Sequence, residues 1–424
     1  MRTLKTNQFL SKSHKMAIVT IAVMFIFGIA NAQTEQQVSD EVVITGGMGG
    51  NQITPRTFPA QVSIFYPMGT HGQQSVDYQY NFSLNLFYGR IGGLNGVEIS
   101  GLVGRVDGDV RGVQVAGIGN MAGNFSGYST RYSFQEAGNV SGIQVAGIFN
   151  GAGNITGIQT GGIFNGAGNA VGVQTAGIVN GAGNLVGIQT AGIFNGAGNV
   201  NGIQTAGIFN AAGNVTGMQV GGIFNVAANM NGIQIAGIFN RTQTLRGLQI
   251  GLISVNDTIE SGGSLSLVNI VRRGFYRSWE VSVADYSNLA VTYRMGTRTL
   301  YTIYTVGANF IEDNLWNFGI GFGHRRAISN NLDFRPEIVS YNYFSMDFKD
   351  IQPTFSTHLK FGFVYNVSEN FGISIAPSVF QLSSRRCNSD ADFYRVSPIA
   401  PFYTRERNNW QTAIGVGISL GVNF

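Results

Sequence analysis

Between Gly142 and Asn240 the apolar and polar residues recur at every fifteenth position without insertion. Successive copies read GIQVAGIFNGAGNIT, GIQTGGIFNGAGNAV and GVQTAGIVNGAGNLV, and looser copies open at Gly112, Gly127 and Gly247. Counted from the opening glycine, a copy has an aliphatic residue at position 2, Gln at 3, Gly at 6, Ile at 7 and Asn at 9 and 13. Such a fixed period indicates one structural unit that packs against copies of itself.

Two arrangements satisfy this pattern. In a parallel β-solenoid each copy is one coil, equivalent residues stack about 4.8 Å apart, and the small residues at positions 10 to 12 suit tight corners. In a single large barrel each copy is one antiparallel strand with a GAG turn, because about 12 residues come close to a tilted membrane-crossing strand. Stacked identical amides favour the solenoid. The predicted ladder residues are Gln144, Gln159, Gln174, Gln189, Gln204, Asn150, Asn165, Asn180, Asn154 and Asn169.

After Asn256 the period gives way to strict alternation of apolar and polar residues. The last segment is the clearest, with Ile414, Val416, Ile418 and Leu420 on one face and small or polar residues on the other, up to a terminal Phe. This alternation over a membrane-crossing length is typical of a transmembrane β-barrel. Eight such strands are predicted, joined by alternately short and long connections.

Every charged residue of these alternating strands falls on the polar face. A charge that faces lipid at mid-depth costs about 2–4 kcal/mol, so the polar face is expected to be the interior. Eight strands enclose a space that side chains fill, which predicts a buried ion-pair core and no open pore. The predicted interior residues are Glu280, Arg294, Arg325, Asp333, Arg335, Glu337 and Lys360.

The N-terminus has the pattern of a secretory signal peptide: a basic start, an apolar run from Met16 to Ile29 and an Ala30-Asn31-Ala32 cleavage site. A cleaved leader implies export. The predicted domains are a signal peptide (1–32), a flexible entry segment (33–59), N-terminal strands or a cap (60–95), the repeat domain (96–256) and an outer-membrane β-barrel (257–424).

Little in the sequence indicates reaction chemistry. No acidic or basic residue occurs from Ala137 to Asn240, so the repeats lack the carboxylates of a polysaccharide-cleaving site. The single Cys387 excludes an internal disulfide, and the histidines lack metal-ligand spacing. Asp107-Gly108-Asp109 is only a fragment of a calcium loop. The sequence contains no basic patch with interleaved aromatic residues, so we do not expect nucleic-acid binding. We expect no enzyme activity, catalytic residues, metal or cofactor.

The run GVQVAGIGN, GIQVAGIFN, GIQTAGIFN resembles the G-x-Q-x-x-G-I-x-N repeats of bacterial surface-repeat proteins. The ending GVGISLGVNF resembles that of Gram-negative outer-membrane β-barrels, which implies that Phe424 is the assembly signal. Together they imply an outer-membrane protein with a structural or adhesive role at the cell surface. The implied partners are outer-membrane lipid, the outer-membrane assembly machinery and a surface polysaccharide or host molecule. The alternative is a porin-like channel formed by one large barrel that includes the repeats.

Overall fold

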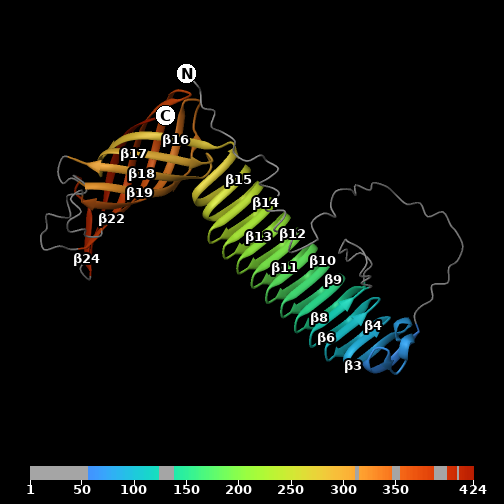
Figure 1. Cartoon of the computed structure of the whole chain (residues 1–424). Coiled ribbons are helices and arrows are strands. Elements are labelled where there is room, and N and C mark those ends of the chain that lie inside the picture. Colours follow the sequence, from blue (N-terminus) through green and yellow to red (C-terminus); the bar gives the residue numbers. More distant parts are fainter. Residues whose placement is uncertain (1–55, 124–137, 311–314, 346–353, 386–398, 408–409) are drawn as a thin grey trace, which may run out of the picture. The chain divides into compact units, whose positions relative to one another are not determined.

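The computed structural model describes residues 56–123, 138–310, 315–345, 354–385, 399–407 and 410–424 (Figure 1). It is all-β, with 82% strand, and has a β-solenoid of about 11 turns followed by a separate antiparallel sheet, which confirms the predicted fold class. Residues 1–55, with the predicted signal peptide and most of the entry segment, lie outside the described residues. The chain divides into two compact units, residues 1–213 and 214–424.

The first unit consists of parallel solenoid coils. β1 pairs in parallel with β3, β3 pairs with β4 and β5, and the later strands continue these two ladders. The strands are β1 (Thr57–Phe65), β2 (Met68–Gly69), β3 (Gln79–Ile91), β4 (Gly93–Ser100), β5 (Val103–Val106), β6 (Val110–Ala116), β7 (Gly119–Ala122), β8 (Asn139–Ala146), β9 (Phe149–Gly161), β10 (Phe164–Ala176), β11 (Val179–Ala191), β12 (Phe194–Ala206) and β13 (Phe209–Gly221), which crosses into the second unit.

A short 3-10 helix, η1 (Gly72–Asp77), lies between β2 and β3. Among the described residues, no helix has both the length and the apolar character that a membrane crossing requires.

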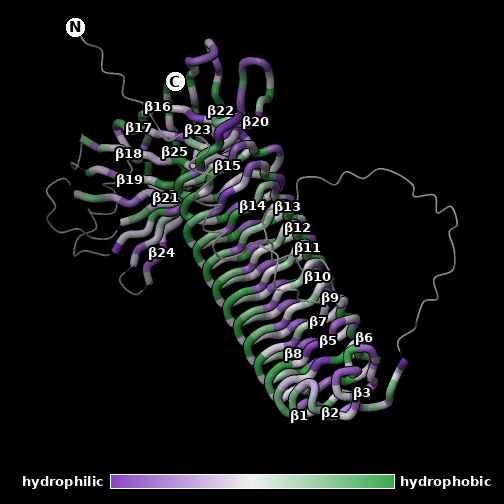
Figure 2. The backbone as a smooth tube through the Cα atoms, turned by 45° about the vertical axis from the view of Figure 1, so that its right-hand side comes forward, coloured by the Kyte–Doolittle hydropathy of each residue, from purple (hydrophilic) through white to green (hydrophobic). Residues whose placement is uncertain are grey.

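The repeats stack in register, so that each residue pairs with its equivalents one period earlier and one period later. Gln174 of β10 lies between Gln159 of β9 and Gln189 of β11, and all three strands run in the same direction. In Figure 2 the hydrophobic and hydrophilic segments accordingly line up from coil to coil. This parallel pairing shows that the alternative of antiparallel repeat strands in one large barrel is wrong.

Each regular coil buries the amides at positions 3 and 9, the small residue at position 5 and the residue at position 14, and leaves the side chains at positions 2, 4, 7 and 15 exposed or partly exposed. In the coil from Gly142, Gln144, Ala146, Asn150 and Ile155 are buried, whereas the side chains at positions 2, 4, 7 and 15 are exposed. The bend lies at positions 6 and 7, and the GAG segment lies inside a strand. The expectation of a corner at positions 10 to 12 is therefore wrong. In one coil the ring at position 8 lies over position 10, since a Cβ on Gly196 would lie 2.9 Å from Phe194 Cε1.

The opening glycine of each coil is required by its backbone. Gly172 has φ +129°, a value that side-chain-bearing residues rarely adopt, and its neighbours in the stack share this conformation. A Cβ on Gly172 would lie 2.0 Å from the carbonyl oxygen of Gly157 in the preceding coil. The constant glycine at position 1 therefore allows two backbones to approach closely.

The second unit contains the last coils and a closed antiparallel sheet. β14 pairs in parallel with β15, and eight later strands form a ring that is closed by pairing of β16 with β25. Its strands are β14 (Phe224–Ala236), β15 (Phe239–Arg273), β16 (Tyr276–Ala284), β17 (Ser287–Gly296), β18 (Tyr301–Asn309), β19 (Leu315–Gly323), β20 (Arg326–Ala327), β21 (Leu332–Ser345), β22 (Thr354–Ser368), β23 (Phe371–Arg385), β24 (Tyr403–Arg407) and β25 (Trp410–Asn423).

The barrel has a polar and aromatic interior and an apolar exterior. Tyr286, Tyr301, Tyr341 and Phe380 belong to the buried core. Along β25, Val416, Ile418 and Leu420 are 51%, 45% and 55% exposed, so the alternating face predicted as apolar does point outward.

The solenoid extends beyond Asn256, where the sequence period ends. β15 continues to Arg273, and the first barrel strand begins at Tyr276 instead of at residue 257. Buried Ser254 and Ser264 replace the usual amides in this last part, and this substitution hides the coil from a search for the period.

Candidate functional site

A column of stacked glutamines occupies the solenoid interior. In the first unit Gln159 Nε2 donates a hydrogen bond to Gln144 Oε1 at 2.8 Å, and Gln174 Nε2 donates to Gln159 Oε1 at 2.7 Å. These side chains are fully buried, so the column satisfies amides that would otherwise be costly to bury. The predicted residues Gln144, Gln159, Gln174, Gln189 and Gln204 all belong to this column.

The asparagines form two further columns in different surroundings. Asn165 Nδ2 donates to Asn180 Oδ1 at 2.9 Å and to the carbonyl oxygen of Thr175 at 2.7 Å, and this column is buried. Asn169 Nδ2 donates to Asn154 Oδ1 at 2.7 Å in a column near the surface. Position 9 is thus interior, and position 13 forms a ladder nearer the surface. The predicted residues Asn150, Asn165 and Asn180 lie in the first column, and Asn154 and Asn169 in the second.

Glu98 stands at the first end of the glutamine column, at the position that Gln occupies in later coils. Gln114 Nε2 donates to Glu98 Oε2 at 2.8 Å, and Asn85 Nδ2 donates to Glu98 Oε1 at 3.0 Å. Both carboxyl oxygens of Glu98 accept hydrogen bonds, so Glu98 orients the Gln114 amide and, through it, the amide of Gln144 in the next coil. Glu98 therefore sets the direction of the glutamine column.

Asp109 has the same role for the outer asparagine column. Its Oδ1 accepts hydrogen bonds from the backbone N and from Nδ2 of Asn139, at 2.9 and 3.2 Å. Asn154 Nδ2 donates to Asn139 Oδ1 in turn. Asp107 pairs with Arg90 and Arg105, so the two aspartates of the suspected calcium fragment have structural partners. Among the described residues, no group of three or more potential metal ligands occurs.

We predict that Glu98 makes the first coils less stable at alkaline pH. Burial raises its pKa from an ordinary 4.5 to about 7, against the lowering effect of its hydrogen bonds with Gln114, Asn85 and Ser83. A raised folded-state pKa gives stability that is complete below pH 4.5 and is lost as the pH rises through 7. The difference between pH 4.5 and 8 is up to about 3 kcal/mol.

The Glu98→Gln variant should remove this dependence and stabilise the first coils at pH 8. Hydrogen exchange of peptides from residues 79–122, corrected for intrinsic rates, measures the effect in the intact protein. The exposed Asp77→Asn change provides the control, since it removes a carboxylate from the same region. Equal pH dependence in wild type and Glu98→Gln would contradict the prediction.

Four charged side chains form an ion-pair network inside the barrel. Arg294 Nε lies 2.7 Å from Glu337 Oε1, and Arg294 Nη2 lies 3.3 Å from Glu280 Oε2. Arg335 Nη2 lies 2.6 Å from the same Glu280 oxygen. All four are less than 9% exposed, so the two arginines and two glutamates neutralise one another in a space that excludes water.

The other predicted interior residues surround this network. Arg325 pairs with Asp333 near the end of the barrel where β15 enters, and Asp333 also accepts a hydrogen bond from Asn366 at 2.7 Å. Lys360 donates to the Tyr286 hydroxyl and lies over the rings of Tyr286 and Tyr341. The structure thus places Glu280, Arg294, Arg335, Glu337 and Lys360 in the interior, with Asp333 buried and Arg325 partly exposed at the rim.

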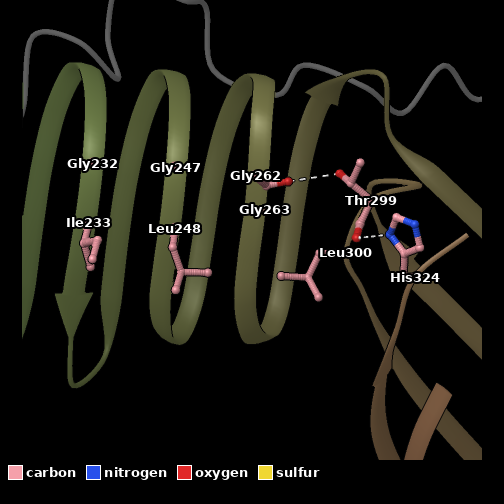
Figure 3. A pocket seen from close by; sticks show the side chains of 9 residues that line it. All are labelled: Gly232, Ile233, Gly247, Leu248, Gly262, Gly263, Thr299, Leu300 and His324. Atoms are coloured by element: carbon pink, nitrogen blue, oxygen red, sulfur yellow. Dashed lines mark hydrogen bonds between the residues drawn. The ribbon is translucent and has the colours of Figure 1, made fainter. Parts of the chain in front are cut away.

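An apolar groove of about 590 Å³ lies within the second unit (Figure 3). Ile233, Leu248 and Leu300 supply its side-chain walls. Thr299 Oγ1 donates to the carbonyl oxygen of Gly262 at 3.0 Å, and His324 Nδ1 lies 2.8 Å from the carbonyl oxygen of Thr299. These contacts hold the turn between β17 and β18 against the last coil. The groove contains no pair of groups arranged for acid–base or nucleophilic chemistry.

Glu98, Asp109 and the interior tyrosines were not predicted as site residues from the sequence. Glu98 could have been found by aligning Gly96 with the repeat, because an acid then replaces the glutamine of position 3. Tyr286, Tyr301 and Tyr341 could not be found in this way, because they meet only when non-adjacent strands are brought together by closure of the ring. Phe424 is exposed, and its backbone exchanges two hydrogen bonds with Trp279.

Comparisons with known protein families, with curated proteins and with solved structures find no match to this chain.

Proposed function

We propose that this protein is a non-catalytic structural component of the Gram-negative cell envelope, anchored in the outer membrane by its C-terminal barrel. Outer-membrane lipid and the outer-membrane assembly machinery would be its partners. The observation that carries the proposal is the apolar outer surface of the barrel. Leu359, Ile373 and Val283 are 44%, 53% and 58% exposed on neighbouring parts of it, whereas Glu280 and Lys360 point inward. An exposed apolar surface of this extent is costly in water and suits a lipid environment.

Aromatic pairs near both ends of the barrel support the same proposal. At the end where β15 enters, the rings of Trp279 and Tyr293 are 4.5 Å apart, and those of Phe371 and Phe424 are 5.8 Å apart. At the opposite end, the rings of Trp316 and Phe344 are 4.7 Å apart, and those of Phe355 and Trp410 are 5.7 Å apart. Two such girdles mark the membrane–water interfaces of transmembrane barrels.

The length between the girdles fits a membrane. The strand β25 begins at Trp410, has 14 residues and ends next to Phe424. At about 3.4 Å per residue and a tilt of about 40°, this strand spans about 36 Å along the membrane normal. That distance covers an apolar band of about 25 Å and part of both interfaces.

The filled interior favours an anchor over a channel. The Arg294–Glu337 and Arg335–Glu280 pairs lie in the interior, and the hydroxyl of the core residue Tyr301 donates a hydrogen bond to Glu337. An eight-stranded barrel has room for little beyond its own side chains. We therefore expect no open-pore conductance in planar bilayers, and regular conductance steps would contradict the anchor function.

The connections between strands suggest on which side of the membrane the solenoid lies. The turn between β17 and β18, the turn between β22 and β23 and the entry from β15 are all at one end of the barrel. The two longest connections, which follow β21 and β23, join strand ends at the opposite end, and the longer loops of outer-membrane barrels are extracellular. The solenoid precedes β16 at the end with the short turns, so we assign it to the periplasmic side, where it has a structural role instead of an adhesive one.

Protease treatment of intact and permeabilised cells tests this assignment. Repeat peptides should be released only after the outer membrane is permeabilised, and the protein should fractionate with the outer membrane. Release of repeat peptides from intact cells would reject the periplasmic assignment and favour the adhesive surface role. Recovery of the leader-free protein as a detergent-free monomer would reject the membrane anchor itself.

A further inference from the structure

The solenoid of the first unit presents a sheet surface without charged side chains, whose columns are exposed among the described residues. We name it the outer face and define it as the side chains at positions 2 and 4 of five coils, together with the position-15 residue just before each opening glycine; these coils open at Gly142, Gly157, Gly172, Gly187 and Gly202. Position 2 forms its central column, where Ile143, Ile158 and Ile188 are 36%, 42% and 41% exposed. Valine and threonine form much of the flanking columns, so methyl groups cover most of this face.

The outer face is regular because the coils pair in register. Ile188 lies between Val173 and Ile203, and Thr190 lies between Thr175 and Thr205. Each row therefore repeats the one before it at about 4.8 Å. A second surface fits such a row pattern best when it has the same spacing, since only then can the side chains of both interdigitate along the full length.

Charge further restricts what can cover this face. No Asp, Glu, Lys or Arg occurs from residue 137 to residue 240. The face therefore offers no ion pair to a charged partner, and a charged group placed against it would lose its hydration without compensation. A partner must itself be uncharged, apolar and flat.

We infer that the occupant of the outer face is the outer face of a second copy of this chain. The two would form an isologous dimer, in which each patch is complementary to itself. Five coils at about 4.8 Å and three outward residues per coil give a patch of roughly 24 by 20 Å. Two such patches bury about 1,000 Å² in total, the lower limit for a specific interface.

Two isoleucines of the same repeat provide a matched test. Ile188 lies in the outer face and is 41% exposed, whereas Ile193 lies at the bend of position 7 and is 43% exposed. The full-length protein in detergent should be a dimer by light scattering coupled to size exclusion. Ile188→Lys should weaken the dimer by about 100-fold, because it buries a charge in the interface. Ile193→Lys should remain dimeric.

A second measurement covers the case in which lysine disturbs the coil. Ile188→Ser removes the apolar side chain without adding charge and should also weaken the dimer. In a Cys387→Ser background, Ile188→Cys should be crosslinked between copies by a short bismaleimide, and Ile193→Cys should not. A monomeric wild type, or equal behaviour of the two positions, would overturn the inference. Fractionation with the outer membrane tests the anchor separately, because none of these residues lies in the barrel.

Discussion

Replacing Gly172 by alanine should unfold the middle of the solenoid locally and leave the barrel intact. The new Cβ would lie 2.0 Å from the carbonyl oxygen of Gly157, and the residue would be held at φ +129°. Backbone atoms cannot move away as a flexible side chain can, so the coils must separate. We expect a loss of at least about 3 kcal/mol, from backbone strain combined with overpacking.

The distribution of tryptophan allows the two parts to be followed separately. The three tryptophans, Trp279, Trp316 and Trp410, all belong to barrel strands. Their fluorescence should therefore show an unchanged barrel transition in Gly172→Ala. Hydrogen exchange of peptides from residues 142–206 should increase, because each coil of a repeat protein depends on its immediate neighbours.

Gly166→Ala provides the control within the neighbouring coil. Gly166 occupies position 10, and the equivalent residue three coils later is Ala211. The chain itself thus accepts alanine at this position, and exchange should change little. If Gly166→Ala and Gly172→Ala were equally disruptive, close backbone approach at position 1 would not be the reason for the regular spacing of the opening glycines along this chain.

Glu337→Gln should destabilise the barrel by about 3–5 kcal/mol, the usual cost of removing one partner from a buried ion pair. Glu337 accepts hydrogen bonds from Arg294 at 2.7 and 3.1 Å and from the Tyr301 hydroxyl at 2.8 Å. The variant retains the shape of the side chain and removes the charge. Glu280 would then balance both Arg294 and Arg335, so the network of these four residues would have a net positive charge.

Urea unfolding followed by tryptophan fluorescence measures this loss in the detergent-solubilised protein. The midpoint should fall in Glu337→Gln, while exchange in the solenoid coils stays unchanged. Glu369→Gln is the matched control, because Glu369 is exposed in the turn between β22 and β23. An unaltered midpoint in Glu337→Gln would mean that water enters the barrel and hydrates these charges, in conflict with a filled interior.

Much of the architecture follows from short-range patterns. The fixed period of the repeat predicts stacked coils, because identical residues such as Gln159, Gln174 and Gln189 can satisfy one another only in parallel register. Alternation along β25 predicts which side chains point into the barrel, because successive side chains of a strand point to opposite faces. Charge then identifies the inner face without further information, and Arg294 and Glu337 lie there as predicted.

Other features depend on neighbours that the sequence does not identify. The GAG segment looks like a turn in isolation, but it lies in a strand because it pairs with the same segment of the coils on either side, as Gly166 does with Gly151 and Gly181. The last coil loses the repeat signature and is held by contacts such as the hydrogen bond from Thr302 Oγ1 to the carbonyl oxygen of Ser266 at 2.6 Å. The extent of this coil can be recognised only once β15 and β18 are both folded.

By itself, the sequence determined the coil period, the register of the amide columns and the inward face of each barrel strand, because these depend on spacing along one chain segment. Only the tertiary structure decided which partners meet. Arg335 and Glu280 are 55 residues apart and pair because β16 and β25 close the ring. Burial of Glu98 likewise depends on the coils around it. Which acidic residue pairs with which basic residue depends on the distance between them in three dimensions and on how far both are removed from water. The spacing of residues along the chain encodes neither quantity.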